Sequence, residues 1–199
     1  MAVMELQQKP ARTQRPYHHG DLRRTLLDAA VTVTSEKGPA GLSVREVSRR
    51  VGVSHAAGIH HFRDKRGLLT AVATEGFQRL RSQLGAAWEA SSGSFLEVGV
   101  AYVRFAFDQR PYFEVMFRPD LYRADDPELS RAKREAAALL YGGVASVLGD
   151  GVEMDRLTSG VAAWSLMHGL ATLWLTDNLP AGLGDDPAEV ARKVGRHLF

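Results

Sequence analysis

Cysteine is absent from the 199-residue chain, and so are long apolar runs. The lack of thiols excludes a disulfide scaffold, a cysteine-based zinc site and a thiol nucleophile. No apolar stretch reaches the roughly 18 residues that a membrane-spanning helix needs. The polar N-terminal region also lacks the apolar stretch of a signal peptide. We therefore expect a cytoplasmic protein.

Several motifs of common enzyme classes are missing too. The chain has no GxxxxGK[ST], HExxH or GxSxG pattern. Asp120, Asp125 and Asp126 cluster in one segment, but such a group is more typical of a solvated or helix-capping loop than of a catalytic site. We do not expect an enzyme, and no residue set predicts a cofactor.

Positive charge is concentrated toward the N-terminus. Residues 1–70 carry 12 Lys and Arg against 6 Asp and Glu, a net charge of +6, whereas the remainder carries −4. A basic end on a mildly acidic body is typical of a nucleic-acid-binding protein. A solvated basic surface would give the same balance, so charge alone does not decide between the two.

The apolar pattern is helical throughout, without strand alternation or internal repeats. A first helix is expected from Asp21, with apolar residues every three or four positions, ending before Gly38 and Pro39. The sequence predicts an all-α fold of about nine helices. Besides a pair of short helices near residue 50, the expected helices span 65–88, 95–108, 111–117, 127–148, 155–176 and 187–197.

Residues 43–62 favour two short helices joined by a tight turn. Ser43, with Glu46 three residues later, forms a capping box for the first helix. Gly52 ends that helix and permits a sharp turn, and Ser54 caps the second helix, expected at about His55–Phe62. The pattern is typical of a helix-turn-helix, whose second helix enters the major groove of DNA.

The residue types around this turn suit DNA. His55 can read a base edge, and Ala56 is small enough for close approach or contact with a thymine methyl. The hydroxyls of Ser43 and Ser54 lie at helix N-termini, where anions are favoured, and Lys65 opens the next helix. Such phosphate contacts set affinity and register without reading sequence. Arg49 and Arg50 late in the first short helix, and Arg63 and Arg66 beside Lys65, are further candidates.

Residues 21–76 closely resemble the DNA-binding domain of TetR-family regulators. The resemblance rests on DLRRTLLDAAVTVTSEKG and LSVREVSRRVGVSHAAGIHHFRDKRGLLTAV, which end the recognition helix with Ile59-His60-His61-Phe62 before Lys65. Ile59 and His60 replace the family's usual aromatics, and Gly58 is unusual inside a helix.

The resemblance implies a role for each matching position. It implies base-facing positions at His55 and Ala56, and phosphate contacts by the other matching residues. The predicted DNA-binding set is Ser43, Arg45, Ser54, His55, Ala56, His60, His61 and Lys65.

Three histidines within seven residues could also suggest a metal site. Adjacent helical residues point about 100° apart, however, and His55 and His60 also diverge. No acidic or cysteine ligand accompanies them. We predict no metal site.

The C-terminal part resembles the ligand-binding half of the same family more loosely. Its Trp164, His168 and Gly169 are similar to a Trp–His–Gly signature of one large subgroup. Bulky residues here can line a pocket for an apolar or aromatic effector, or simply form the core. His168 can likewise be a pocket group or a satisfied core histidine. The predicted ligand-binding set is Tyr102, Phe105, Phe113, Met116, Phe117, Trp164, Met167 and His168.

These features predict a flexible arm at 1–20, a DNA-binding domain at 21–67 and a ligand-binding and dimerisation domain at 68–199. The resemblance implies a homodimer that pairs segments 127–148 and 155–176, where small residues allow close helix approach. Such a dimer would bind a palindromic double-stranded operator.

We expect an effector to release this dimer from its operator, with the helix that begins at Lys65 as the lever. Repression is the expected mode of regulation. The alternatives are a helical enzyme and an architectural DNA-binding protein that senses nothing. A cavity in the C-terminal part would favour the sensor over the architectural protein.

Overall fold

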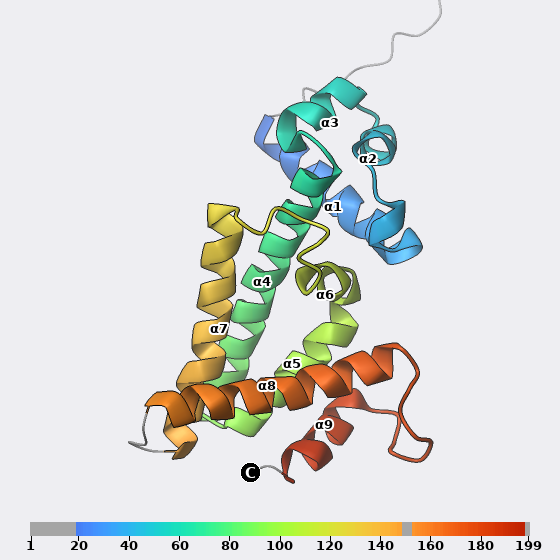
Figure 1. Cartoon of the computed structure of the whole chain (residues 1–199). Helices are drawn as coiled ribbons and strands as arrows, with labels where there is room; N and C mark the ends of the chain where they lie inside the picture. Colours follow the sequence, from blue (N-terminus) through green and yellow to red (C-terminus); the bar gives the residue numbers. More distant parts are fainter. Residues whose placement is uncertain (1–18, 149–152, 198–199) are drawn as a thin grey trace, which may run out of the picture.

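The computed structural model describes residues 19–148 and 153–197. Within these ranges the regular structure is entirely helical, with nine α-helices and one 3-10 helix, and this confirms the predicted fold class (Figure 1). Residues 1–18, most of the predicted arm, lie outside the described residues. The elements are α1 (His19–Lys37), η1 (Pro39–Gly41), α2 (Val44–Val51), α3 (His55–Phe62), α4 (Lys65–Ala90), α5 (Phe95–Asp108), α6 (Arg110–Met116), α7 (Pro127–Leu148), α8 (Glu153–Leu175) and α9 (Pro187–Gly195).

The first three helices and η1, which we call the head, lie at one end of the molecule (Figure 1). The Ser43 hydroxyl accepts a hydrogen bond from the Glu46 N–H at 3.1 Å, and the Ser54 hydroxyl accepts one from the Ala57 N–H at 3.2 Å. Gly52 closes α2 with a φ of 77°, a left-handed conformation that glycine adopts without strain. The predicted N-caps and turn are therefore confirmed. The Glu46 carboxylate, which was expected to complete a capping box with Ser43, accepts hydrogen bonds from Lys37, Arg49 and Arg50.

Helix α4 connects the head to the rest of the molecule. It begins beside α3, where the Asp64 carboxylate caps it by accepting the Gly67 N–H at 2.8 Å. Its 26 residues correspond to about 39 Å of continuous helix. Figure 1 shows α4 running from the head down alongside α7. The predicted boundary at residues 67 and 68 therefore falls inside one unbroken helix.

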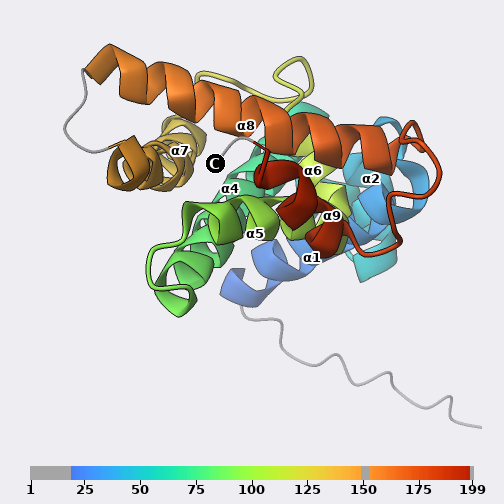
Figure 2. The ribbon, with the colours of Figure 1, turned by 90° about the horizontal axis from the view of Figure 1, so that it is seen from below.

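Helices α5 to α9 form the body, with α5 at its centre. Helix α5 packs against α4, α6, α7, α8 and α9, and Phe105 on it is fully buried. Figure 2 shows α9 lying between α5 and α8. The Arg192 guanidinium joins α9 to α5 by donating two hydrogen bonds to the Glu97 carboxylate, at 2.8 and 2.9 Å.

The predicted helix positions agree with the structure to within a few residues. Segments 95–108 and 127–148 match α5 and α7 at both ends, and segment 155–176 corresponds to Glu153–Leu175. Prolines near the starts of α6 and α7 fit because the first turn of a helix leaves N–H groups unused. Over the described ranges, no helix combines the length and apolarity that crossing a membrane requires.

Candidate DNA-binding surface and effector cavity

Helix α3 presents most of the predicted DNA-contacting residues on its outer face. Ser54, His55, Ala56 and His60 are exposed and His61 is half-buried. Ile59 is also exposed, at 38%. The opposite face carries Gly58 and Phe62, which are buried against the rest of the head. The helix therefore offers a contiguous polar face of small and imidazole side chains to an approaching duplex.

Gly58, unusual inside a helix, is explained by its contact with α2. A Cβ atom at this position would lie 2.2 Å from the Ser48 Oγ and 2.8 Å from the Val44 Cγ1, closer than atoms can approach. The glycine therefore lets α3 lie directly against α2. The close packing of α3 on α2 offsets the loss of helix propensity, which is about 1 kcal/mol for glycine relative to alanine.

The Glu46 carboxylate gathers cations on the outer side of α2. It accepts hydrogen bonds from Lys37 at 3.3 Å, from Arg49 at 3.0 and 3.1 Å, and from Arg50 at 3.0 Å. The Arg49 and Arg50 guanidiniums, followed by the Lys37 ammonium, lower the pKa of Glu46 to about 2. Arg50 also forms an ion pair with Glu36 at 2.6 Å. Arg49 and Arg50, two of the candidate phosphate partners, are thus engaged in ion pairs within the head.

Arg45 and Lys65, two other predicted DNA contacts, differ in how far they are engaged within the protein. Arg45 is exposed on the first turn of α2, and its guanidinium makes no ion pair within the described part of the chain. The Lys65 ammonium donates a hydrogen bond to the Ala40 carbonyl oxygen at 2.7 Å, which ties the start of α4 to η1. Because an ammonium group has three N–H donors, this bond leaves donors for a phosphate.

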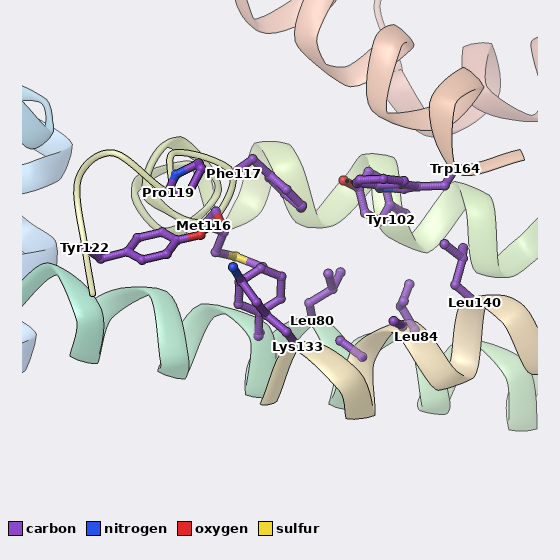
Figure 3. Close-up of a pocket in the computed structure, with 13 residues that line it drawn as sticks. Leu80, Leu84, Tyr102, Met116, Phe117, Pro119, Tyr122, Lys133, Leu140 and Trp164 are labelled. Atoms are coloured by element: carbon purple, nitrogen blue, oxygen red, sulfur yellow. Dashed lines mark hydrogen bonds between the residues drawn. The ribbon is translucent and has the colours of Figure 1, made fainter. Parts of the chain in front are cut away.

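An apolar cavity of about 320 Å³ lies between α4, α5, α6, α7 and α8 and the segment that joins α6 to α7 (Figure 3). This volume lies at the small end of the range usual for ligand sites. Its walls are aliphatic and aromatic, apart from a single lysine. The lining residues are Phe77, Leu80, Leu84, Tyr102, Met116, Phe117, Pro119, Tyr122, Lys133, Ala136, Ala137, Leu140 and Trp164.

Four of the eight residues predicted to bind a ligand line this cavity, and four do not. Tyr102, Met116, Phe117 and Trp164 face it. The other four belong to the packing behind the wall. Phe105 is fully buried, Phe113 and His168 stack on Phe117 at ring-centroid distances of 5.2 and 4.7 Å, and Met167 lines a separate, much smaller space.

A short hydrogen-bond chain supports the wall formed by Tyr102 and Trp164. The Trp164 indole N–H donates to the Tyr102 oxygen at 3.2 Å, and the Tyr102 hydroxyl lies 2.8 Å from the His168 Nδ1. Burial lowers the pKa of His168 and raises that of Tyr102, so the imidazole is neutral and the phenol stays protonated. The tautomer of the neutral imidazole sets which of the two groups donates, and in either case His168 is a satisfied partner behind the wall.

The sequence analysis missed the contributions of α4 and α7 to the cavity. Leu80 and Leu84 look like ordinary core positions of a long helix, and nothing local distinguishes them. Lys133 does carry a signal, because it lies on the apolar stripe of α7, four residues after the buried Leu129 and seven before Leu140. A charged residue in such a stripe is unusual and indicates a functional or structural partner.

Two connections join the cavity region to the head. On α6, the Tyr112 hydroxyl donates to the Glu75 carboxylate at 3.0 Å, and the same carboxylate pairs with Arg24 of α1 at 2.9 Å. Burial, followed by the Glu75 charge, raises the pKa of Tyr112 to about 12, so it remains a donor at neutral pH. Helix α6 is thereby linked to α1 through one buried carboxylate.

The second connection is the segment between α6 and α7. Arg66 donates to the Tyr122 carbonyl oxygen at 2.9 Å, and the Arg123 N–H donates to the Thr70 hydroxyl at 3.0 Å. The Arg123 guanidinium also pairs with Asp64 at 2.7 Å. Since Tyr122 lines the cavity as well, this segment contacts both the cavity and the start of α4.

Comparisons with known proteins agree with this arrangement. Residues 26–72 match the family described as bacterial regulatory proteins, tetR family, and residues 95–198 match the tetracyclin repressor-like C-terminal domain. Among curated proteins, the chain is 27% identical over 158 residues to the HTH-type transcriptional regulator BetI of Cronobacter sakazakii, covering 77% of each chain. It is 28% identical over 185 residues to BetI of Escherichia coli O45:K1, covering 79% of this chain and 94% of the relative.

Solved structures share the fold. A protein of unknown function from Rhodococcus sp. RHA1 is 33% identical and superposes with a TM-score of 0.77, over 92% of this chain and 96% of that one. The multidrug binding protein EbrR in complex with proflavin is 22% identical, with a TM-score of 0.58 over 89% and 99% of the two chains. The chain belongs to the TetR family of DNA-binding transcriptional regulators.

Proposed function

We propose that the chain is a repressor that binds a palindromic operator as a homodimer and is released by a small apolar or aromatic effector in the body cavity. The observation that carries this proposal is the pairing of an exposed recognition helix with an apolar cavity in one molecule. Helix α4 and the segment around Tyr122 contact both regions. A cavity of this kind supports a sensor over an architectural protein.

The proposed DNA contacts follow from exposure and residue type. His55 and Ala56 occupy the first turn of α3, where they would reach base edges in the major groove. The remaining proposed residues would contact phosphates through hydroxyl, imidazole, guanidinium or ammonium groups. These are Ser43, Arg45, Ser54, His60, His61 and Lys65.

Helix α8 supports the proposed dimer. Leu157, Val161 and Leu173 expose 49, 42 and 46% of their surface, which is unusual for large apolar side chains in one helix. Leu157 and Val161 lie one turn apart and share a face, whereas Leu173, twelve residues further on, lies about 120° around the helix from Val161. The dimer face is therefore proposed around Leu157 and Val161. A two-fold pair through α8 would present two α3 helices to half-sites about 34–36 Å apart, or a multiple of that spacing.

The small residues expected at this interface have mixed roles. Ala136 and Ala163 are buried within the protomer, whereas Ala138 and Ala162 are exposed and available for close approach between helices.

The proposed release mechanism is a shift between two arrangements of the heads. An effector that fits the cavity better in one arrangement favours it by its difference in affinity, which is about 1–3 kcal/mol in typical allosteric proteins. Displacement of Tyr122 by the effector would disturb the bonds of Arg66 and Arg123 to neighbouring backbone and side chains. Those bonds hold the start of α4, and so the spacing of the heads.

Several finer assignments are part of the same proposal. They are a head at 21–67 and a body at 68–199, a cytoplasmic location, and no enzymatic activity. Membership of the Trp–His–Gly subgroup also remains a prediction, supported by the hydrogen-bond chain that joins Trp164 to His168 through Tyr102.

The test is a gel shift of the purified protein on the intergenic DNA upstream of its own gene, over a salt series. We expect tight, palindrome-dependent and salt-sensitive binding. Lys65→Ala should weaken binding to all sequences alike and flatten the salt slope. His55→Ala should instead relax preference at one base position.

Two outcomes would contradict the proposal. Binding no stronger than to random DNA, both upstream and in a genome-wide selection of bound fragments, would remove the operator-binding role. A protein that sediments as a monomer while bound to a single half-site would remove the dimer.

A further inference from the structure

The cavity has a charged end and an apolar end. Figure 3 shows Lys133 near Tyr122 and Met116 at one end, while Leu84, Leu140 and Trp164 lie toward the other. The polar atoms of Tyr102 and Trp164 are already used in the hydrogen-bond chain behind the wall. An occupant would therefore meet one cationic group and otherwise apolar surface.

The Lys133 ammonium is held by two aromatic rings. Its Nζ lies 4.9 Å from the ring centroid of Tyr122 and 5.6 Å from that of Phe77. Such cation–π contacts position an ammonium group but do not neutralise its charge. No acidic residue lines the cavity, and within the described part of the chain Lys133 has no carboxylate partner.

An unneutralised cation against an apolar cavity favours an anionic occupant, because a charge in such surroundings is costly unless paired. One ammonium compensates one negative charge. A phosphate dianion would retain an unpaired charge here, since no arginine lines the cavity to provide a second cation. A carboxylate needs only the single partner that Lys133 provides.

On the basis of the proposed effector site, we propose that the effector is an amphipathic monocarboxylate whose carboxylate pairs with Lys133 and whose acyl or aryl body fills the cavity toward Leu84, Leu140 and Trp164. Cationic aromatics should be rejected, because their charge would face Lys133 without a compensating carboxylate. The cavity volume of about 320 Å³ suits a compact acid better than a long lipid.

The test measures direct binding to the full-length protein by calorimetry, without DNA. The probes are two matched sets with the same apolar body: decanoate, 1-decanol and decylammonium, and 1-naphthylacetate with its alcohol and amine counterparts. Proflavin serves as a further cationic probe. We expect at least one acid to bind about tenfold or more tightly than its alcohol, and the amines and proflavin to bind most weakly.

Variants of Lys133 test whether the preference for acids over alcohols depends on this side chain. Lys133→Met should abolish the difference in binding affinity between each acid and its alcohol, and Lys133→Arg should retain that difference. Lys133→Glu should reverse it in favour of the amine, a gain that an unfolded variant could not produce. The control is Lys193→Met, which removes the same charge from an exposed position on α9 and should leave every affinity unchanged.

Failure of this inference can be distinguished from failure of the proposed function. No binding by either acid, or an acid preference that survives Lys133→Met, overturns the carboxylate assignment even if the protein binds its operator. If an acid binds through Lys133 but does not release the operator in a gel shift, the carboxylate site stands and the proposed release mechanism is wrong.

Discussion

In the head, the short helices α2 and α3 expose a largely polar surface that ion pairs hold in place, whereas apolar side chains from α4 to α8 surround a cavity. Glu46 alone contacts three cations on the surface of the head. Among the residues that line the cavity, no carboxylate lies beside Lys133. Glu46 thus pairs its neighbouring cations within the head, whereas the Lys133 charge at the cavity has no carboxylate beside it among the lining residues.

This difference separates a surface that needs a fixed shape, the recognition helix of the head, from a surface that can bind and release a small molecule, the cavity. The caps and ion pairs of the head hold α3 in one orientation, as a DNA reader requires. Hydrogen bonds among Tyr102, Trp164 and His168 support one wall of the cavity, while the wall at Tyr122 belongs to the segment between α6 and α7 rather than to a helix. Four experiments test the comparison, from the largest expected effect to the smallest.

Phe105→Ala should lower the free energy of unfolding by about 3–5 kcal/mol, because it removes a fully buried ring at the centre of the body. Phe117→Ala should cost less, since Phe117 is only half-buried and already borders an empty space. Urea unfolding measures both. Equal losses would mean that the cavity wall is packed as tightly as the core.

Gly58→Ala should lower stability by about 1–3 kcal/mol through overpacking, because the new Cβ would overlap Ser48 and Val44. The same change at Gly169 is the matched control, since nothing lies within 4 Å of a Cβ there. That variant should gain up to about 1 kcal/mol from helix propensity. Thermal unfolding of the two variants separates crowding from propensity, and a stabilised Gly58→Ala would refute the close α2–α3 contact.

Tyr112→Phe should lower the free energy that stabilises the contact between α6 and the head by about 1.5 kcal/mol, because it removes one hydrogen bond to the Glu75 carboxylate. Hydrogen exchange should speed up in α1, which reaches this carboxylate through Arg24. Tyr122→Phe removes a hydroxyl that donates to the Met116 carbonyl within the body, so it should leave α1 unchanged. The same exchange rates in α1 for both variants would argue against this route.

The smallest effect is the acid sensitivity of the head. The pKa of Glu46 is lowered from 4.5 to about 2 by its cations, so its stabilisation is present above pH 4.5 and is lost as the pH falls toward 2. Unfolding measured from pH 6 to pH 2 should show wild type more stable than Glu46→Gln near neutrality. The difference should shrink across this window, and a constant difference would show that the carboxylate charge is not responsible.

Short-range sequence patterns predicted most of the helix boundaries in the head. Ser43, Gly52 and Ser54 act through neighbours within a few residues, so capping and turn chemistry could be predicted from sequence. Helix positions in the body followed from apolar periodicity in the same way. The Glu46 side chain was less predictable, because its partners include Lys37 on another helix.

Only the tertiary structure decided which bulky residues of the body face a cavity. Phe105 and Phe117 carry the same side chain in neighbouring segments that were both predicted to be helical, yet one fills the core and the other lines the cavity. Periodicity identifies a buried face, but whether that face meets another side chain or an empty space depends on how α4 to α8 pack together. For the same reason Gly58 inside a helix and Lys133 in an apolar stripe are unusual in the sequence, and each has a physical explanation only in the folded protein, where α2 lies against α3 and α7 lies beside the cavity.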